Sequence, residues 1–223
     1  SGLCCTALFF SKIDGFPKDK VSGQPCTNLL KDYRCKIHSQ LEKQKMKGCI
    51  GYDCFGAGQQ ETQVIYQGQT WNDIPNHSTE IFDVFIIIFQ LYQIRYYLIE
   101  ATSLISAQPL EKSIHSLIEE NIKMCHCCPN SILSLDLEQY RLRSNYILKH
   151  VCKLLQQSIH SEYKKIPANF LGSNFKGQDM SGADLSTKLL IATNFEKSVF
   201  NGTIFLGADT RDTNFKDADL SEA

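Results

Sequence analysis

The last quarter of the chain repeats its hydrophobic pattern every five residues. Eleven blocks follow one another from Ala168 to Glu222 without a slip, and the third residue of each block except Thr210 is Phe, Met or Leu. The first residue is mostly small. A period of five fits neither the helical period of 3.6 nor the strand period of 2. The pattern predicts a coil in which each block forms one side, turns a corner and points its first and third residues inward.

The fifth and second positions of the blocks carry the residues that corners need. Glycine is frequent at the fifth position, where a corner favours a positive φ. Asn and Asp are frequent at the second position, where their side chains bond nearby backbone in turns. The glycines at the fifth position are Gly172, Gly177, Gly182, Gly202 and Gly207.

The middle of the chain shows helical periodicity in three stretches. The first begins at Ser78 as an N-cap and runs to about 103, with apolar residues on more than one face, as in the central helix of a bundle. The second spans about 110–124 after Pro109, and the third spans about 137–163 with apolar residues three and four apart. Pro167 ends the third stretch. These stretches predict a helical bundle.

The first segment is rich in cysteine and leaves three explanations open. Disulfides require an oxidising compartment, buried free thiols suit any single cysteine, and metal ligation suits a clustered set. The turn-like surroundings favour ligation, with His38 as a further ligand. Six of the ten cysteines of the chain lie here: Cys4, Cys5, Cys26, Cys35, Cys49 and Cys54.

Charge and hydropathy argue against nucleic acid and membranes as binding partners. The 223 residues include 23 basic and 24 acidic ones, without a long basic run, so direct nucleic-acid binding is not expected. Charges interrupt the most apolar segment, 81–105, and leave 84–89 as its longest pure run, far short of a membrane span of ~20 residues. No signal peptide is visible. We therefore expect a cytoplasmic protein without membrane contact.

The five-residue pattern resembles the pentapeptide-repeat family, whose motif reads A-(D/N)-(L/F)-x-x. The resemblance implies a right-handed, four-sided (quadrilateral) β-helix with four repeats per coil. The expected fold class is therefore multidomain α plus β. Its parts would be a Cys-rich segment at 1–77, a helical bundle at 78–165 and the β-helix at 166–223.

The Cys-rich segment resembles the YkgJ-type zinc- or iron-chelating domain. The resemblance is carried by Cys4-Cys5, Cys26 through Leu29, Cys35 through His38, and then Cys49 or Cys54. An earlier cysteine pair of that family has no counterpart in this sequence. The resemblance implies zinc or an iron–sulfur cluster as cofactor. The ligands would be Cys4, Cys5, Cys26, Cys35, Cys49 and Cys54, with His38 as a further candidate.

Three functions from different classes follow. The first is a binding module that joins a metal- or cluster-binding domain to a repeat scaffold, which presents a surface to an unidentified protein partner; the oligomeric state is left open. The second is a DNA mimic that protects or inhibits a type II topoisomerase. Residues 166–223 have a net charge of −3, from five basic and eight acidic residues, whereas ~14 Å of duplex, the expected height of the coils, carries about eight charges.

The third function is a cluster-dependent enzyme that modifies proteins. His38, Asp53 and Cys54 are the neighbouring residues that such chemistry would use. No Ser/His/Asp order, paired carboxylates or nucleotide motif stands out beside them. The sequence therefore favours a binding module over an enzyme.

Overall fold

A computed structural model describes residues 1–158 and 169–223. Contacts group the chain into two compact units: residues 1–100 with 114–144, and residues 101–113 with 145–223. These units do not coincide with the predicted division at residues 77 and 165, which stays a prediction. The predicted helix end near 163, the turn at Pro167 and the first residue of the repeats, Ala168, lie outside the described residues.

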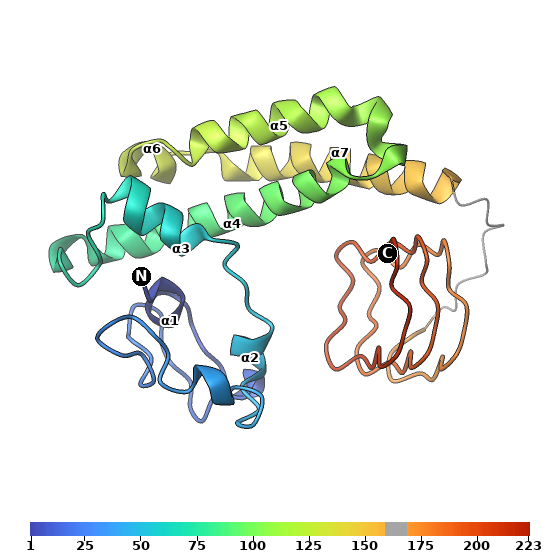
Figure 1. Cartoon of the computed structure of the whole chain (residues 1–223), viewed down its shortest axis with the longest axis horizontal. Helices are drawn as coiled ribbons and strands as arrows, with labels where there is room; N and C mark the ends of the chain where they lie inside the picture. Colours follow the sequence, from blue (N-terminus) through green and yellow to red (C-terminus); the bar gives the residue numbers. More distant parts are fainter. Residues whose placement is uncertain (159–168) are drawn as a thin grey trace. The chain divides into compact units, whose positions relative to one another are not determined.

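The Cys-rich segment consists of short turns around a small core. Its helical pieces are α1 (Leu3–Ala7), η1 (Lys12–Asp14), η2 (His38–Gln40) and α2 (Lys47–Ile50) (Figure 1). Single antiparallel bridges join Phe10 to Lys20 and Leu29 to Cys35. Phe16, Ile37 and Met46 form the buried cluster beneath these loops. Such a small core leaves the fold of this segment dependent on hydrogen bonds between its loops, such as that from the amide of Gly23 to the carbonyl oxygen of Thr6 at 2.9 Å.

A short helical connection leads from the Cys-rich segment to the bundle. It contains α3 (Ala57–Gln59), the π-helical turn η3 (Gln60–Ile65) and the 3₁₀ turn η4 (Pro75–His77). The helix α4 (Ser78–Thr102) follows at once. π-Helical turns are rare and often mark functional positions.

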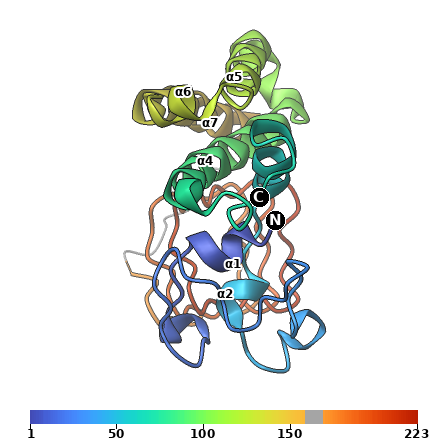
Figure 2. The ribbon, with the colours of Figure 1, turned by 90° about the vertical axis from the view of Figure 1, so that its left-hand side faces the viewer.

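The bundle packs α4 against α5 (Glu111–Met124) and α7 (Leu137–Ser158), which run alongside it in Figures 1 and 2. Asn121 on α5 is fully buried and joins the three helices. Its side-chain amide donates to the carbonyl oxygen of Leu91 at 2.9 Å and to the hydroxyl of Tyr140 at 3.1 Å. The Tyr140 hydroxyl donates in turn to the carbonyl oxygen of Leu117 at 3.0 Å. These bonds fix the register of the helices because a buried polar group that loses its partners is costly.

The three predicted helices are present, with modest differences. The 3₁₀ turn η5 (Ile105–Leu110) precedes α5, and a further short helix, α6 (Pro129–Leu133), occupies a stretch predicted as a loop. On α5 the buried face includes Asn121, whereas the apolar Ile122 is 41% exposed. A pattern of apolar residues alone does not identify a buried asparagine whose hydrogen-bond partners lie on other helices.

Helix α4 combines length with low polarity. Within the described residues, one helical stretch, Pro75–Thr102, is long and apolar enough to cross a membrane by length and composition. The core helix of a bundle meets the same criterion, and Val84, Phe85 and Ile88 on α4 are fully buried by the protein itself. The expected lack of membrane contact stays a prediction.

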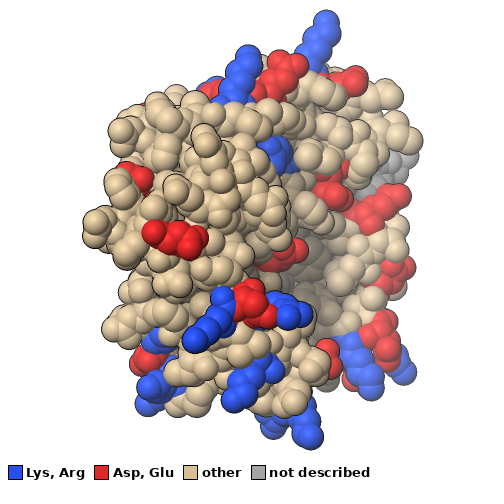
Figure 3. All heavy atoms as spheres, turned by 60° about the vertical axis from the view of Figure 1, so that its left-hand side comes forward, with Lys and Arg blue, Asp and Glu red and all other residues tan. Residues whose placement is uncertain are grey.

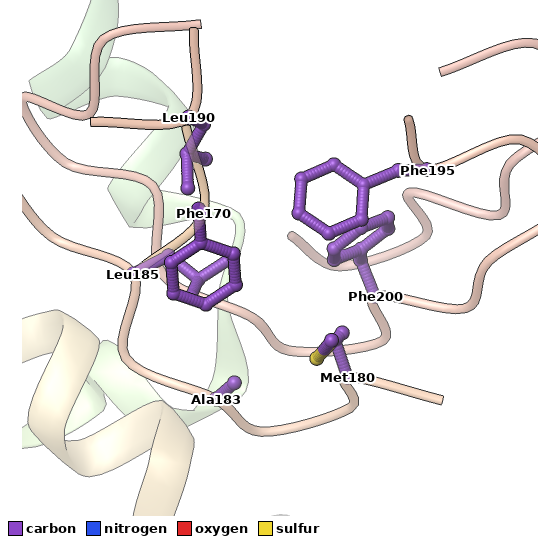
Figure 4. Packing of buried hydrophobic residues seen from close by; sticks show 7 residues of the cluster. All are labelled: Phe170, Met180, Ala183, Leu185, Leu190, Phe195 and Phe200. Carbon is purple, nitrogen blue, oxygen red and sulfur yellow. The ribbon is translucent and has the colours of Figure 1, made fainter. Parts of the chain in front are cut away.

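The repeats at 169–223 wind into a coil with a continuous apolar interior, as Figure 4 shows for seven of its residues. The third residues of most blocks supply this interior, and small first residues such as Ala183 complete it. Thr210 and Leu220 are exceptions, since both are exposed. Aromatic rings stack from one turn of the coil to the next; the ring centroids of Phe195 and Phe215, four blocks apart, are separated by 5.6 Å. The interior cluster contains Phe170, Met180, Ala183, Leu185, Leu190, Phe195 and Phe200, flanked by Phe175, Phe205, Ala208, Phe215 and Ala218.

Side-chain hydrogen bonds explain the other positions of the block. A buried hydroxyl at the first position donates to the third-position carbonyl oxygen of the preceding turn, as from Thr203 to Met180 at 2.7 Å. An Asn or Asp at the second position accepts from the amide two residues later, as Asp184 does from Ser186 at 2.9 Å. The fifth residue has a positive φ in every block, including non-glycine residues such as Thr187. The inward-pointing and turn-forming roles predicted from the sequence are confirmed.

The predicted quadrilateral β-helix, and with it the α plus β fold class, is wrong. The described residues contain no β-strand or sheet and are mostly helical outside the repeats. Neighbouring turns of the coil meet through isolated parallel bridges, such as Asn174 with Asn194. The bend with positive φ at every fifth residue interrupts the pairing before a strand extends. The 20-residue offset of the bridged residues equals four blocks; we call residues 169–223 the repeat coil.

Candidate functional site

Helix α1 carries the first two thiols of the Cys-rich segment. Leu3, Thr6 and Ala7 are its buried residues, and the side chains of Cys4 and Cys5 are half-buried. The chain enters α1 through Gly2, whose φ of 65° suits glycine. The amide of Cys26 donates to the carbonyl oxygen of Cys5 at 2.9 Å, which ties the next cysteine to this helix.

A tight turn brings Cys35 back toward Cys26. Tyr33 has a φ of 63°, Leu29 pairs with Cys35, and the amide of Lys36 donates to the carbonyl oxygen of Asn28 at 2.8 Å. Cys49 follows on α2, and both Cys35 and Cys49 pack against the small buried core. Local turns therefore collect thiols that are far apart in the sequence.

The adjacent thiols of Cys4 and Cys5 share a proton-donating contact. Their sulfur atoms lie 3.9 Å apart. A hydrogen bond from the Cys5 thiol lowers the pKa of Cys4 to about 7, although burial opposes this shift. The same hydrogen bond and burial raise the pKa of Cys5. One member of the pair is therefore readily ionised at neutral pH and the other stays protonated.

The remaining thiols are near enough to influence one another. Burial raises the pKa of Cys49 to about 11, and negative charge on Cys26, Cys35 or Cys4 adds to the rise. Burial likewise raises the pKa of Tyr52, with further contributions from Cys4 and Cys54. The Tyr52 hydroxyl is buried and has no hydrogen-bond partner among the described residues. All six predicted ligand cysteines thus belong to one electrostatic neighbourhood.

Lys20 places a positive charge beside this neighbourhood. Its ammonium group donates to the carbonyl oxygens of Thr6 at 3.0 Å, Val21 at 3.1 Å and Gln24 at 2.7 Å. Burial lowers the pKa of Lys20, whereas negative charge on Cys26 or Cys5 raises it. The ammonium group thereby holds the loop at residues 20–24 to α1 and favours thiolates nearby.

The thiols do not form a ready-made metal site. Across residues 1–158 and 169–223, no group of three or more Cys, His, Asp or Glu side chains is arranged to hold a metal ion. All ten cysteines of the chain are free thiols. His38 begins the exposed turn η2, and its described bond is local, from its amide to the carbonyl oxygen of Cys35. The structure therefore brings the cysteines into one region but not to ligation distances.

The residues considered for catalysis are not assembled. The carboxylate of Asp53 accepts from the amide of Phe55 at 2.7 Å, which is a local turn contact. In the described part of the chain, no hydrogen bond links His38, Asp53 and Cys54. A second group of cysteines lies near α6, but its members do not share one environment: Cys125 is fully buried, whereas Cys128 is exposed.

Sequence reasoning missed Lys20, the Tyr52 hydroxyl and Glu61. Nothing in the sequence distinguishes Lys20 from the other surface lysines, because its three acceptors are backbone atoms. Tyr52 stands two residues before Cys54, which is the one available signal. Glu61 lies in η3 with 0% exposure, and no periodic pattern marks it as buried.

The outer surface of the repeat coil is the second candidate site. The amide side chains of Asn174, Asn194 and Asn214 form a row across three turns, with bonds of 3.0 Å and 2.8 Å. Beside this row Lys176 pairs with Glu196 at 3.0 Å, and Lys216 is near enough to lower the pKa of Glu196 further. We call these six residues the amide face. On the side of the molecule in Figure 3, positive and negative side chains are interspersed.

The last part of the repeat coil matches the model of a known family. Residues 189–223 match the family model for pentapeptide repeats, in eight copies. The earlier blocks carry the same hydrogen-bonding positions but lie outside the matched range. The YkgJ-type resemblance of the Cys-rich segment is not confirmed by a family match.

A curated relative extends the similarity beyond the repeats. The chain is 36% identical over 166 residues to the uncharacterized protein YybG of Bacillus subtilis (strain 168). The aligned residues are 74% of this chain and 59% of YybG, so the chain spans about three fifths of its relative. An alignment of that length necessarily includes residues outside the pentapeptide repeats. No solved structure matches the chain.

Proposed function

We propose that the chain is a binding module whose repeat coil presents the amide face to a protein partner. The observation that carries this proposal is that each position of the five-residue block has a distinct structural role in the coil. Its first and third residues fill the interior, and its second residues fix the corners, so the exposed side chains are held on a rigid support. Rigid side chains lose little conformational entropy on binding, which favours recognition.

The composition of the amide face argues against the alternative function, a mimic of duplex DNA that binds a type II topoisomerase. Asparagine amides both donate and accept hydrogen bonds, and the two lysines surround a single glutamate. A mimic of duplex DNA requires a dense acidic surface. The amide face is instead suited to a partner with mixed polar groups.

Site-specific photo-crosslinking tests this proposal. A photoreactive residue at position 194 should capture one protein partner in cells that naturally make the chain, since Asn194 is central in the amide face. The same residue at position 179, on another column of second positions, is the matched control. Equal capture of the same partner from both positions would contradict the assignment of the face.

We propose as a second function that the Cys-rich segment binds a thiophilic metal, zinc or an iron–sulfur cluster. The influence of negative charge on Cys4, Cys26 and Cys35 on the pKa values of Cys5 and Cys49 supports it. Because no group of three potential ligands is preformed in the described residues, the thiol side chains would have to turn toward one another. Free thiols persist in reducing compartments, so we propose the cytoplasm as the location.

Metal content of anaerobically purified protein tests the second proposal. Cys26→Ser and Cys35→Ser should each lower the metal content and the melting temperature of the Cys-rich segment. Cys128→Ser, an exposed cysteine outside this segment, is the control and should change neither. Full metal content and unchanged melting in both ligand variants would refute the ligand assignment.

A further inference from the structure

Glu61 is buried without any compensation. Its side chain lies in η3 and has 0% exposure. Neither carboxyl oxygen has a hydrogen-bond partner among the described residues. An isolated buried carboxylate is far less stable than a neutral carboxyl group, because no partner replaces the water that it loses. The buried surroundings of Glu61 therefore favour the protonated, neutral carboxyl group over the carboxylate.

The groups around Glu61 do not supply a balancing positive charge. Within η3 and the following residue, the amide of Tyr66 donates to the carbonyl oxygen of Glu61 at 2.9 Å. From α4 and the turn before it, the titratable groups are Glu80, which accepts from the Tyr66 hydroxyl at 3.0 Å, and His77, which lies 3.7 Å from Glu80. His77 is directed at Glu80 and is largely exposed.

The end of α5 contributes one more titratable group, the buried thiol of Cys125. Its carbonyl oxygen accepts from the side-chain amide of Gln60 at 2.8 Å. This bond attaches η3 to the end of α5. The thiol itself is acidic rather than basic, so it cannot neutralise a carboxylate. On α4, the positive charge of Arg95 lies near enough to Cys125 to oppose the rise of that pKa. Burial is the cause of the pKa shift of Glu61, and no charged group among the described residues adds to it or opposes it.

Two consequences follow for the proton of Glu61. Burial raises the pKa of Glu61 to about 9 from an ordinary value of 4.5. Burial also raises the pKa of Tyr66, with contributions from Glu80 and Glu61. The carboxyl group is consequently neutral in the packed state and ionised whenever η3 opens to water at neutral pH.

We propose that Glu61 is a proton-controlled latch: its protonated carboxyl group keeps η3 packed against the bundle, and loss of that proton opens the turn. A π-helical turn is suited to this role because such turns are rare and frequently occur at functional sites. The turn also connects the Cys-rich segment to α4. Opening would therefore loosen the attachment of the Cys-rich segment to the bundle.

The sign of the pH dependence is fixed by linkage. Because the pKa in the packed state is the higher one, the stabilisation of η3 is complete below about pH 4.5 and is lost as pH rises toward about 9. Opening releases one proton in this range. The equilibrium constant for opening should rise about tenfold for each pH unit.

Hydrogen exchange of the amides of residues 60–68 tests the latch. We compare the full chain with Glu61→Gln at matched pH values from 6 to 9, so that the intrinsic exchange rates cancel. The ratio of exchange in the original protein to that in Glu61→Gln should rise about tenfold per pH unit. Glu42→Gln, at an exposed position, is the control and should follow the original protein. A ratio that is independent of pH would overturn the proposal.

A second measurement does not depend on the folding of the variant. The infrared carbonyl band of a protonated carboxyl group should be present in the original protein at pH 7 and disappear as pH is raised through about 9. Ordinary carboxyl groups are ionised at pH 7, so they do not contribute to this band. If no such band is present at pH 7, Glu61 is ionised while buried and the latch is wrong.

Discussion

The repeat coil and the Cys-rich segment obtain their structures in opposite ways. In the coil every position of the five-residue block has one task, and the same task recurs 20 residues later with the same bonds. In the Cys-rich segment each turn is different, the buried core has three members, and the polar groups at the centre are thiols. The difference teaches that a periodic segment specifies its fold locally, whereas an irregular one depends on contacts between distant loops.

Removing a ring from the interior should break the coil and spare the Cys-rich segment. Phe195 is fully buried between Phe170, Phe200 and Phe215. Phe195→Ala should destabilise the coil by about 3–5 kcal/mol because it leaves a cavity. Urea unfolding followed by hydrogen exchange of residues 169–223 measures the loss. Leu171→Ala, at a position that is 54% exposed, should change stability by less than about 0.5 kcal/mol. Equal losses in both variants would refute the packed interior.

The Cys-rich segment should instead respond to the ionisation of its thiols. With metal removed, Cys4 should be alkylated more than about 100-fold faster than Cys49 at pH 7, because its thiolate is far more populated. The rate at Cys4 should rise with pH and level off above its pKa of about 7. Mass spectrometry of alkylated peptides measures both rates.

Cys5→Ala provides the matching variant. It removes the hydrogen bond that stabilises the Cys4 thiolate, so the rate at Cys4 should level off at a higher pH. An unchanged pH profile would show that the pair does not share a proton. Such a result would leave the thiols of the two adjacent residues independent.

A hydrogen bond between turns of the coil should contribute less to the free energy of unfolding than a buried aromatic ring does. Thr203→Val keeps the shape of the side chain but removes the bond to the Met180 carbonyl oxygen. The expected loss is about 1 kcal/mol, since that oxygen also accepts from the amide of Ala183. Chemical denaturation of both proteins provides the comparison. A loss equal to that of Phe195→Ala would mean that hydrogen bonds, rather than packing, dominate the coil.

Sequence reasoning succeeded where the pattern is periodic. The inward residues, the corner residues and the three long helices were predictable because each depends on neighbours a few residues away. The β-helix was wrong because the positive φ at Thr187, Ala192 and similar positions interrupts strand pairing, and the family motif does not reveal this. No periodic pattern marks the burial of Glu61, and the acceptors of Lys20 are backbone oxygens, which leave no side-chain signal in the sequence.

The smallest effect concerns the corners that lack glycine. Thr187 is β-branched and has a φ of 59°, a conformation that costs such residues about 1–2 kcal/mol. Thr187→Gly removes this strain but increases the freedom of the unfolded chain by about 0.5–1 kcal/mol. The net gain should be a few tenths to about 1 kcal/mol in a thermal melt. A loss of stability would show that the Thr187 side chain contributes contacts that outweigh its strain.

The proposed binding face is tested most directly by the affinity of the coil for the partner captured at position 194. Lys176→Ala combined with Lys216→Ala removes both lysines of the amide face, whereas Lys188→Ala removes an exposed lysine elsewhere on the coil. Calorimetric titration should give a Kd at least about tenfold higher for the double variant, equal to about 1.4 kcal/mol, and an unchanged Kd for Lys188→Ala. Equal Kd values for all three proteins would contradict the account.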